Sequence, residues 1–567
     1  MNLNLKAKVE QTYDAIVVGS GISGGWAVKE LTEKGLKVLL LERGKPLEHV
    51  VDYKGIDPWG FPHHGRLSNE TRAKFPIQSK EGNYPITEAN QQLWMPESLN
   101  PYLQEKPFDW YRGNQIGGKS LTWGRHTYRL SDLDFEANAK EGIGIDWPIR
   151  YKDIAPWYAY VERFVGISGE ALGLSHIPDS IFQPAMPLNC VEDAFKKGVK
   201  AKYQDSRHVT PGRVAHLTKP TAEQTALGRA SCQYRNACSN GCPYGAYFST
   251  QAATLPAAKK TNNLSVLANA LVSRVIFDEK LNKATGVEVI DTETKERQEY
   301  YAKIIFITAS TIGTTQILLN STSNRFPNGL GNDSGVLGKN LMDHHSRVGA
   351  NAEVEGFEDQ YYFGRKPNGI FIPRYRNIGN DRRDYLRGFD YQGGAGRGGW
   401  EADSKKDGFG ADFKESLLSP GKWSIGMSAF GEFLPDERNQ VRLHPTEKDP
   451  NGLPMLVFEA ELRENEFKMR KDMANDAAEM LEAAGFKNVK SFERTVSLGL
   501  SKHEMGTARM GLEPKTSVLN KHNQVWGCEN VFVTDGSSMV SSSCVNPSLT
   551  YMALTARACD FAVKKFG

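Results

Sequence analysis

The sequence lacks a surplus of charge of either sign and lacks long apolar runs. Its 70 Lys and Arg residues nearly balance 67 Asp and Glu residues, which gives a formal net charge of +3. Proteins that bind nucleic acid or anionic lipid concentrate Lys and Arg, so this balance argues against both kinds of partner. No uninterrupted apolar stretch approaches the ~18 residues that a membrane-spanning helix requires, and we expect no transmembrane segment.

An export signal and internal repeats are also missing. Residues 1–19 contain no apolar core followed by a small-residue cleavage site, so we do not expect export as an autonomous precursor. Export as a folded chain with a signal-bearing partner stays open. The 567 residues, of which 39% are hydrophobic, include 54 Gly and 27 Pro and indicate a globular, loop-rich protein of several domains.

Cysteine is scarce and unevenly distributed. The chain has seven cysteines, an odd number that does not suit a disulfide scaffold, yet Cys232, Cys238 and Cys242 lie close together. A zinc site usually needs four ligands, and this segment offers no fourth Cys or neighbouring His. A disulfide would leave one thiol over. A 3Fe–4S cluster needs three thiolates, and the small residues between these cysteines would let the backbone wrap it.

Residues 13–42 have the pattern of a dinucleotide-binding unit, namely a short apolar strand, a helix and a second apolar strand. Gly19, Gly21 and Gly24 fit the G-x-G-x-x-G motif at the start of the helix, and Glu42 ends the second strand. This turn brings helix N–H groups to a pyrophosphate, and Glu42 is placed to accept hydrogen bonds from the adenosine ribose. The alternative is an ordinary glycine-rich turn with a surface Glu, and the unit alone does not distinguish FAD from NAD.

Further strand patterns and a change of composition indicate two lobes. Residues 264–278, 286–291 and 303–310 are apolar and strand-like. From about residue 346 to 500 the chain is richer in aromatic and charged residues and contains the glycine-rich stretch 391–400. We interpret this region as a separate lobe, inserted between two parts of a nucleotide-binding fold.

Four further segments resemble signature regions of the glucose–methanol–choline (GMC) oxidoreductases, which bind FAD. They follow the family's order and are residues 117–124 (GGKSLTWG), 309–319 (ASTIGTTQILL), 338–344 (GKNLMDH), and 503–511 (HEMGTARMG) with 533–556. The resemblance implies an α/β fold with a Rossmann-like FAD-binding domain and a second, α+β substrate-binding lobe. The expected ranges are 1–345 for the FAD-binding domain, with an inserted cysteine-rich segment at 228–250, then 346–500 for the substrate lobe, and 501–567 for a C-terminal return to the FAD-binding domain.

The resemblance also assigns FAD contacts by position. Besides the glycines and Glu42 of the N-terminal unit, these are Gly117, Gly118, Ser120, Thr122, Val272 and Asp535. Some sugar-oxidising relatives attach FAD covalently to a histidine of the glycine-rich loop, where this chain has Thr122. Threonine cannot form that histidyl bond, so we expect FAD to be bound non-covalently.

The catalytic pair implied by the resemblance is His503 and Asn546. Hydride leaves an alcohol carbon more easily when the hydroxyl loses its proton, and neutral histidine is a suitable base. An amide such as Asn546 would orient the alcohol oxygen. We also expect Asn546 to be the N-cap of a helix that begins at Pro547 and aims its positive end at the flavin.

Other histidines receive less weight. A lone histidine is more often structural than catalytic, and this alternative applies to His503 when the resemblance is set aside. We expect His344 and His345 to be structural, and His126 either to touch substrate or only to pack.

The Cys-x5-Cys-x3-Cys spacing resembles one branch of the family, the bacterial FAD-dependent glucose and fructose dehydrogenases and their glucoside 3-dehydrogenase relatives. In that branch the three cysteines ligate a 3Fe–4S cluster, which implies the same role for Cys232, Cys238 and Cys242. The resemblance further implies a dehydrogenase that passes electrons to a cytochrome c-type or quinone-linked acceptor. It also implies a small signal-bearing subunit and a periplasmic location, with a cytoplasmic location as the alternative.

The function that follows from the resemblance is oxidation of a secondary hydroxyl of a sugar, most specifically C3 of a glucoside. The alternatives are oxidation of an aldose at C1 or of another alcohol, a sugar oxidase that uses O2, a flavin-fold lyase, and a noncatalytic electron-transfer flavoprotein. Trp400, Arg397 and Glu401 are possible sugar contacts, although an exposed glycine-rich loop is the preferred interpretation of that stretch.

Overall fold

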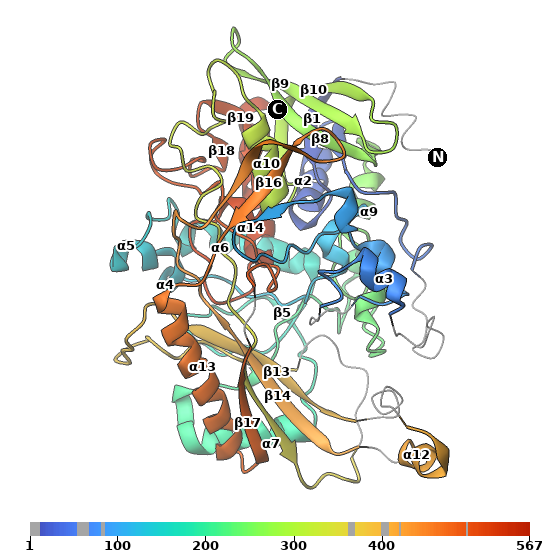
Figure 1. Ribbon diagram of the computed structural model, residues 1–567, viewed down its shortest axis with the longest axis vertical. Coiled ribbons are helices and arrows are strands. Elements are labelled where there is room, and N and C mark those ends of the chain that lie inside the picture. The colour runs from blue at the N-terminus through green and yellow to red at the C-terminus, as the bar shows by residue number, and fades with distance from the viewer. Residues whose placement is uncertain are drawn as a thin grey trace.

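The computed structural model describes residues 12–53, 67–80, 86–360, 369–398, 408–418, 421–494 and 497–567. Two β-sheets lie toward opposite ends of an elongated molecule (Figure 1). Within the described ranges, no helix combines the length and the apolar character needed to cross a bilayer.

The first lobe is built on an eight-stranded sheet with the order β18-β19-β10-β1-β2-β7 and a β8–β9 hairpin that joins at β10. The pairs β1–β10, β1–β2, β10–β19 and β2–β7 are parallel, as expected for a Rossmann-like sheet. The apolar run 264–278 is divided at Asn269, which has a positive φ, into one strand of the parallel sheet and one of the hairpin. The strands are β1 (Thr12–Val18), β2 (Val38–Leu41), β7 (Leu264–Leu267), β8 (Ala270–Asp278), β9 (Lys283–Asp291), β10 (Arg297–Ile307), β18 (Gln524–Val525) and β19 (Cys528–Val533).

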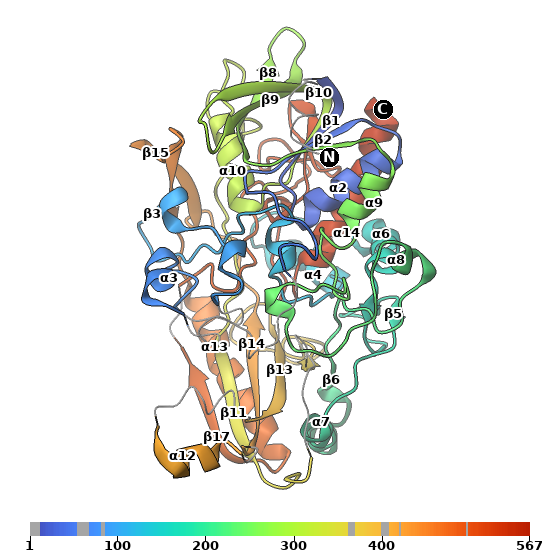
Figure 2. The same ribbon diagram turned by 90° about the vertical axis from the view of Figure 1, so that its right-hand side faces the viewer.

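Helices cover this sheet on both sides. Helix α2 packs against α14 and α9, whereas α10 packs against β8. Figure 2 shows the two groups on opposite sides of the strands. The helices of this lobe are α2 (Ile22–Glu33), α6 (Tyr151–Val165), α9 (Thr254–Lys260), α10 (Thr311–Asn320) and α14 (Ser548–Phe566).

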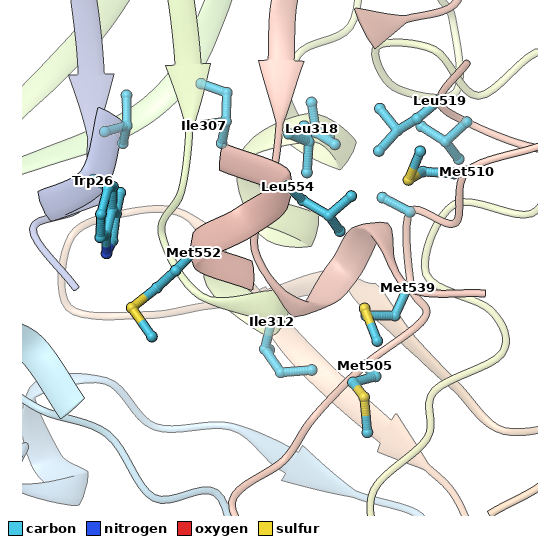
Figure 3. Close-up of a cluster of buried hydrophobic side chains, with 14 of the residues drawn as sticks. Trp26, Ile307, Ile312, Leu318, Met505, Met510, Leu519, Met539, Met552 and Leu554 are labelled. Atoms are coloured by element: carbon cyan, nitrogen blue, oxygen red, sulfur yellow. The ribbon is translucent and has the colours of Figure 1, made fainter. Parts of the chain in front are cut away.

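The C-terminal segment forms part of the core of the first lobe. Met552 and Leu554 of α14 are fully buried beside Ile312 of α10, and Met505 and Met539 join the same cluster (Figure 3). The chain after residue 501 is therefore held in place by apolar burial, the main favourable term in folding.

The second lobe has a six-stranded sheet with the order β17-β11-β14-β13-β12-β6, in which the paired strands are antiparallel. Helix α13 packs against it, and α7 packs on α13. Two of these elements, α7 and β6, lie outside the range 346–500 expected for this lobe. The elements are β6 (Thr210–Pro211), β11 (Val348–Val354), β12 (Ile370–Ile372), β13 (Phe389–Arg397), β14 (Trp423–Gly431), β17 (Lys487–Glu493), α7 (Cys190–Tyr203), α12 (Gly410–Ser416) and α13 (Glu464–Ala483).

A three-stranded sheet lies against the first lobe, where β15 packs on α10. Its strands β15 and β16 also come from the range 346–500, so that range contributes to both lobes. The remaining strands and α-helices are β3 (Leu103–Gln104), β4 (Ile167–Ser168), β5 (Phe182–Gln183), β15 (Gln440–Lys448), β16 (Pro454–Glu459), α3 (Asn69–Lys74), α4 (Asp132–Phe135), α5 (Ala137–Glu141) and α8 (Ala222–Ala226).

The β1–α2 turn allows a matched test of packing. A Cβ added at Gly24 would lie 1.7 Å from the Gly19 carbonyl oxygen, whereas a Cβ added at Gly21 meets nothing within 4 Å. We expect Gly24→Ala to force strand and helix apart and lower the melting temperature by about 5 °C or more. Gly21→Ala is the control, and in FAD-free protein, where ligand binding does not contribute, it should melt close to wild type, as measured by differential scanning fluorimetry. Equal melting temperatures for both variants would contradict the packing described here.

Candidate active site

A large cavity runs from the β1–α2 turn to His503. It encloses about 1750 Å³ of space, part of it open to solvent. Its lining includes most of the residues that the sequence assigned to FAD, which the fold thus brings together from distant segments: Gly19, Gly21, Glu42, Gly118, Ser120, Thr122, Val272 and Asp535. Gly24 and Gly117 do not line it; Gly24 packs against the Gly19 carbonyl, and the Gly117 N–H donates to the Ser20 hydroxyl.

The nucleotide-binding end is shaped by the turn between β1 and α2. Gly19 has a φ of +89°, a conformation that side chains disfavour, and Gly24 lets the helix touch this turn. Gly21 is the N-cap of α2 and has no side chain to cap it, so the first N–H groups of the helix remain available to an anion. Glu42 is held by the Ser20 N–H and hydroxyl, at 2.9 and 2.5 Å, and by the Gly44 N–H at 2.8 Å.

The second glycine-rich turn lies against the first. The Gly117 N–H donates to the Ser20 hydroxyl at 2.8 Å, and a Cβ added at Gly118 would lie 3.3 Å from Gly21 Cα. Ser120 ties this turn together, because its hydroxyl donates to the Gly117 carbonyl at 2.5 Å and accepts from the Thr250 N–H at 3.0 Å. The two turns thus form one continuous backbone surface along the cavity.

Buried polar atoms without partners show that this cavity suits a polar ligand. The Glu504 Oε1 atom and the Tyr551 hydroxyl are both buried without a hydrogen-bond partner, and both residues line the cavity. Glu504 Oε2 pairs with Lys119 at 2.8 Å. Asp535 faces the same space, and its carboxylate accepts from the Thr314 hydroxyl at 2.5 Å and from the Ser537 N–H at 3.1 Å. The N–H groups at the start of α2 fit the phosphates of FAD, and the carboxylates and the Tyr551 hydroxyl fit its hydroxyl and N–H groups.

His503 and Asn546 meet at the far end of the cavity, although they come from different segments. The Asn546 amide nitrogen lies 3.3 Å from His503 Nε2, and Asn546 Oδ1 accepts a hydrogen bond from Gln392 Nε2 at 2.6 Å. His503 Nδ1 lies 2.8 Å from Nδ1 of His344. Burial, with His344 and Lys119 nearby, holds the pKa of His503 well below its ordinary value, so the ring is neutral at physiological pH.

The expectation that Asn546 is the N-cap of the last helix is wrong. Pro547 occupies the cap position without a side-chain hydrogen bond, and α14 begins at Ser548. The Asn546 amide is instead engaged by Gln392 and His503. These contacts satisfy both ends of the amide and outweigh the local preference for a cap.

Sequence reasoning missed three residues that support the pair. Gln392 on β13 anchors Asn546, His344 contacts His503, and the Asp343 carboxylate accepts from the backbone N–H of His503 at 3.0 Å. The only available signal was the pair Asp343 and His344 in residues 338–344, which have the family pattern GxNLxDH. Nothing in the sequence around Gln392 indicates a role in the site.

The histidine at 126 lines the cavity, where its Nδ1 lies 3.1 Å from the Tyr128 hydroxyl. Arg397 does not reach the site; it donates to backbone carbonyls of Glu358, Gln360 and Gly421. Trp400 and Glu401 lie outside the described residues.

The three clustered cysteines line a second, smaller cavity of about 390 Å³, part of it open to solvent. All seven cysteines of the chain are free, so the disulfide interpretation does not hold. In the part of the chain that the structure describes, no three His, Cys, Asp or Glu side chains converge as they would around a single metal ion. The Tyr234 N–H points to Cys232 Sγ at 3.5 Å, and Tyr234 and Asn236 both have positive φ. Left-handed residues of this kind recur in the backbone loops that bind anions.

The two cavities share a wall. Arg125 lines the large cavity, donates to the Cys238 carbonyl at 2.8 Å and stacks on Tyr247, which lines the small one. The Tyr247 hydroxyl donates to the carbonyl of Leu121 at 3.0 Å. His216 Nε2 lies 3.7 Å from Cys238 Sγ. The cysteine loop is therefore packed directly against the glycine-rich turn at 117–124.

Comparison with known proteins is consistent with this geometry. Residues 13–346 and 435–555 match two family models, both described as GMC oxidoreductase. The chain is 29% identical to a 2-methyl-1,2-propanediol dehydrogenase of Mycolicibacterium austroafricanum, over 99% of this chain and 97% of the relative. It is 26% identical to the fructose dehydrogenase large subunit of Gluconobacter japonicus, over 96% and 97%. It is 24% identical to the gluconate 2-dehydrogenase flavoprotein of Pantoea cypripedii, over 96% and 92%.

Among solved structures, the chain resembles pyridoxine 4-oxidase from Mesorbium loti with a TM-score of 0.60 and 15% identity, covering 97% of this chain and 99% of that one. This likeness supports the fold. Because the first family model alone spans more than half of the residues, the chain belongs to the GMC oxidoreductases, FAD-dependent enzymes that act on CH–OH donors.

Proposed function

We propose that this protein is a dehydrogenase that oxidises a secondary hydroxyl of a sugar, most specifically C3 of a glucoside, with FAD as the first electron acceptor. The observation that carries the proposal is the neutral His503 beside the Asn546 amide at the end of a cavity that fits FAD. Similarity to a fructose dehydrogenase and a gluconate 2-dehydrogenase supports a polyhydroxylated substrate.

The roles of the side chains follow from their chemistry. FAD, when bound, supplies the hydride acceptor. His503 Nε2 takes the hydroxyl proton, and the Asn546 amide donates a hydrogen bond to the alcohol oxygen, which orients the C–H bond. Lys119 and Lys502 line the cavity beside this pair. Burial, with Arg347 and Lys119 nearby, lowers the pKa of Lys502 to about 7, so both of its protonation states are populated near neutral pH. A protonated amine here favours negative charge on the bound ring. The buried setting strengthens each of these electrostatic effects.

We also propose that Cys232, Cys238 and Cys242 hold a 3Fe–4S cluster, which supplies one-electron transfer to a cytochrome c-type or quinone-linked acceptor. The cavity that the three cysteines line and the Tyr234 N–H, which points to Cys232 Sγ, support this assignment. The wall of Arg125 and Tyr247 between the two cavities supports a short path for electrons.

A small signal-bearing subunit and a periplasmic location complete the proposal. Both follow from the branch of the family that shares the cysteine spacing. A second candidate substrate is a small branched diol, which is favoured by similarity to the 2-methyl-1,2-propanediol dehydrogenase over 99% of this chain.

The substrate proposal is tested by anaerobic bleaching of the flavin with a panel of glucosides, aldoses and small diols, and by NMR analysis of each product. We expect methyl glucosides to bleach the flavin and to yield a 3-keto product. His503→Ala should retain FAD and lower the bleaching rate about 10²-fold or more, because the base is gone. A lactone as the main product would move the function to aldose C1 oxidation, and a wild-type rate in His503→Ala would remove His503 as the base.

The absence of a histidine at position 122 predicts how FAD is held. We expect acid precipitation of the holoenzyme to release all yellow colour into the supernatant, because the Thr122 side chain cannot form a histidyl bond. The measurement is the flavin absorbance of pellet and supernatant. A yellow pellet would show a covalent bond that Thr122 does not explain.

The cluster proposal predicts about three irons and four sulfides per FAD in enzyme prepared anaerobically with iron. Cys238→Ser should lose the EPR signal of the oxidised cluster and keep FAD. Cys190→Ser is the matched control, because this free thiol lies in the second lobe, at the start of α7. Wild-type enzyme without iron, or an unchanged signal in Cys238→Ser, would contradict the assignment.

A further inference from the structure

A chain of hydrogen bonds runs from the second lobe through the proposed base into the segment before α14. Gln392 donates to Asn546, and Asn546 donates to Nε2 of His503. On the other side of the ring, His503 Nδ1 lies 2.8 Å from His344 Nδ1. His344 Nε2 lies 2.8 Å from the Ser543 carbonyl oxygen and 3.4 Å from that of Ser542.

The direction of these hydrogen bonds follows from the last group in the series, the Ser543 carbonyl. A carbonyl oxygen only accepts, so His344 Nε2 carries a proton and donates to Ser543. Burial lowers the pKa of His344 to about 4, so at neutral pH the ring carries one proton and its Nδ1 is bare. The single proton between the two Nδ1 atoms therefore belongs to His503. The neutral His503 ring then has a bare Nε2, which is the nitrogen beside Asn546.

The carbonyl of Ser543 is itself held in place. Ser543 is a non-glycine residue with a φ of +56°, so its backbone occupies a disfavoured conformation. Its hydroxyl donates to Asp134 Oδ1 at 2.7 Å, and its N–H donates to Glu432 Oε1 at 3.2 Å. These two bonds turn the carbonyl toward His344.

We infer that His344 is a positioning residue that fixes the tautomer of His503, with the proton on Nδ1 and the lone pair of Nε2 directed at the substrate. This inference rests on the proposed role of His503 as the base. It assigns a function to a histidine that the sequence suggested to be only structural. It also gives a reason for the disfavoured backbone conformation of Ser543. The Ser543 carbonyl fixes which nitrogen of His344 carries the proton, and His344 in turn fixes which nitrogen of His503 carries one.

Two substitutions test the two ring nitrogens of His344 separately. Asparagine places an oxygen near the position of Nδ1 and can still accept the proton of His503. Glutamine places its amide near the position of Nε2, so it can bond Ser543 but offers no acceptor to His503. We expect His344→Asn to reduce flavin with methyl α-D-glucopyranoside within about tenfold of the wild-type rate, and His344→Gln to be about 10²-fold slower. The rates are measured anaerobically by stopped flow.

A direct readout of the tautomer does not depend on activity. The chain has 12 histidines, so holoenzyme labelled with ¹⁵N-histidine gives a tractable NMR spectrum, and His503→Gln identifies the signals of His503. We expect Nδ1 of His503 in the protonated range and Nε2 in the unprotonated range, in wild type and in His344→Asn. The pattern should be reversed or mixed in His344→Gln.

The neighbouring His345 is the matched control. Its ring is equally buried but packs on Gly431 rather than on His503. His345→Asn should leave the His503 signals unmoved. A protonated Nε2 in wild type, or equal rates and equal His503 signals for the Asn and Gln variants of His344, would overturn the inference. If no alcohol reduces the wild-type flavin, the proposed function fails, and the NMR pattern still decides the tautomer.

Discussion

One buried carboxylate holds the loop that carries the proposed base. Asp343 accepts from the backbone N–H groups of His344 and His503 at 2.8 and 3.0 Å, and from those of Gly499 and Ser501 at 2.9 and 3.3 Å. Its burial, together with Glu504 nearby, raises the pKa of Asp343 to about 7. A buried carboxyl group without hydrogen-bond partners is costly in free energy. Asp343 therefore needs the four N–H donors, and the loop needs Asp343 to hold these donors in place. The conformation of residues 499–503 follows from this contact.

The site combines three parts of the chain around that anchor. The second lobe supplies Gln392, the GxNLxDH segment supplies His344, and the segment before α14 supplies Asn546. A buried ion pair between Arg387 and Glu432, 3.0 Å long, links the second lobe to the same segment, because Glu432 also accepts from the Ser543 N–H. Losing one partner of a buried pair is strongly destabilising, so this contact fixes how the segment before α14 meets the second lobe.

Local patterns in the sequence were enough to predict part of this arrangement. The β1–α2–β2 unit, its glycines and Glu42 lie close together in the chain, and the structure forms them as expected. The contacts that complete the site join residues far apart in sequence: His344 with His503 and Gln392 with Asn546 are each separated by more than 150 positions. Such pairings leave no periodic signal. Asn546 shows the consequence, because its tertiary partners override the helix-capping role that its neighbours suggest.

The central claim is that one cavity joins the dinucleotide-binding turn to the His503–Asn546 pair. A crystal structure of the enzyme with bound FAD tests this most directly. The account predicts the adenosine ribose at Glu42, the pyrophosphate at the start of α2, and the isoalloxazine ring beside His503 and Asn546. A dinucleotide bound elsewhere, or an isoalloxazine ring remote from His503, would contradict it.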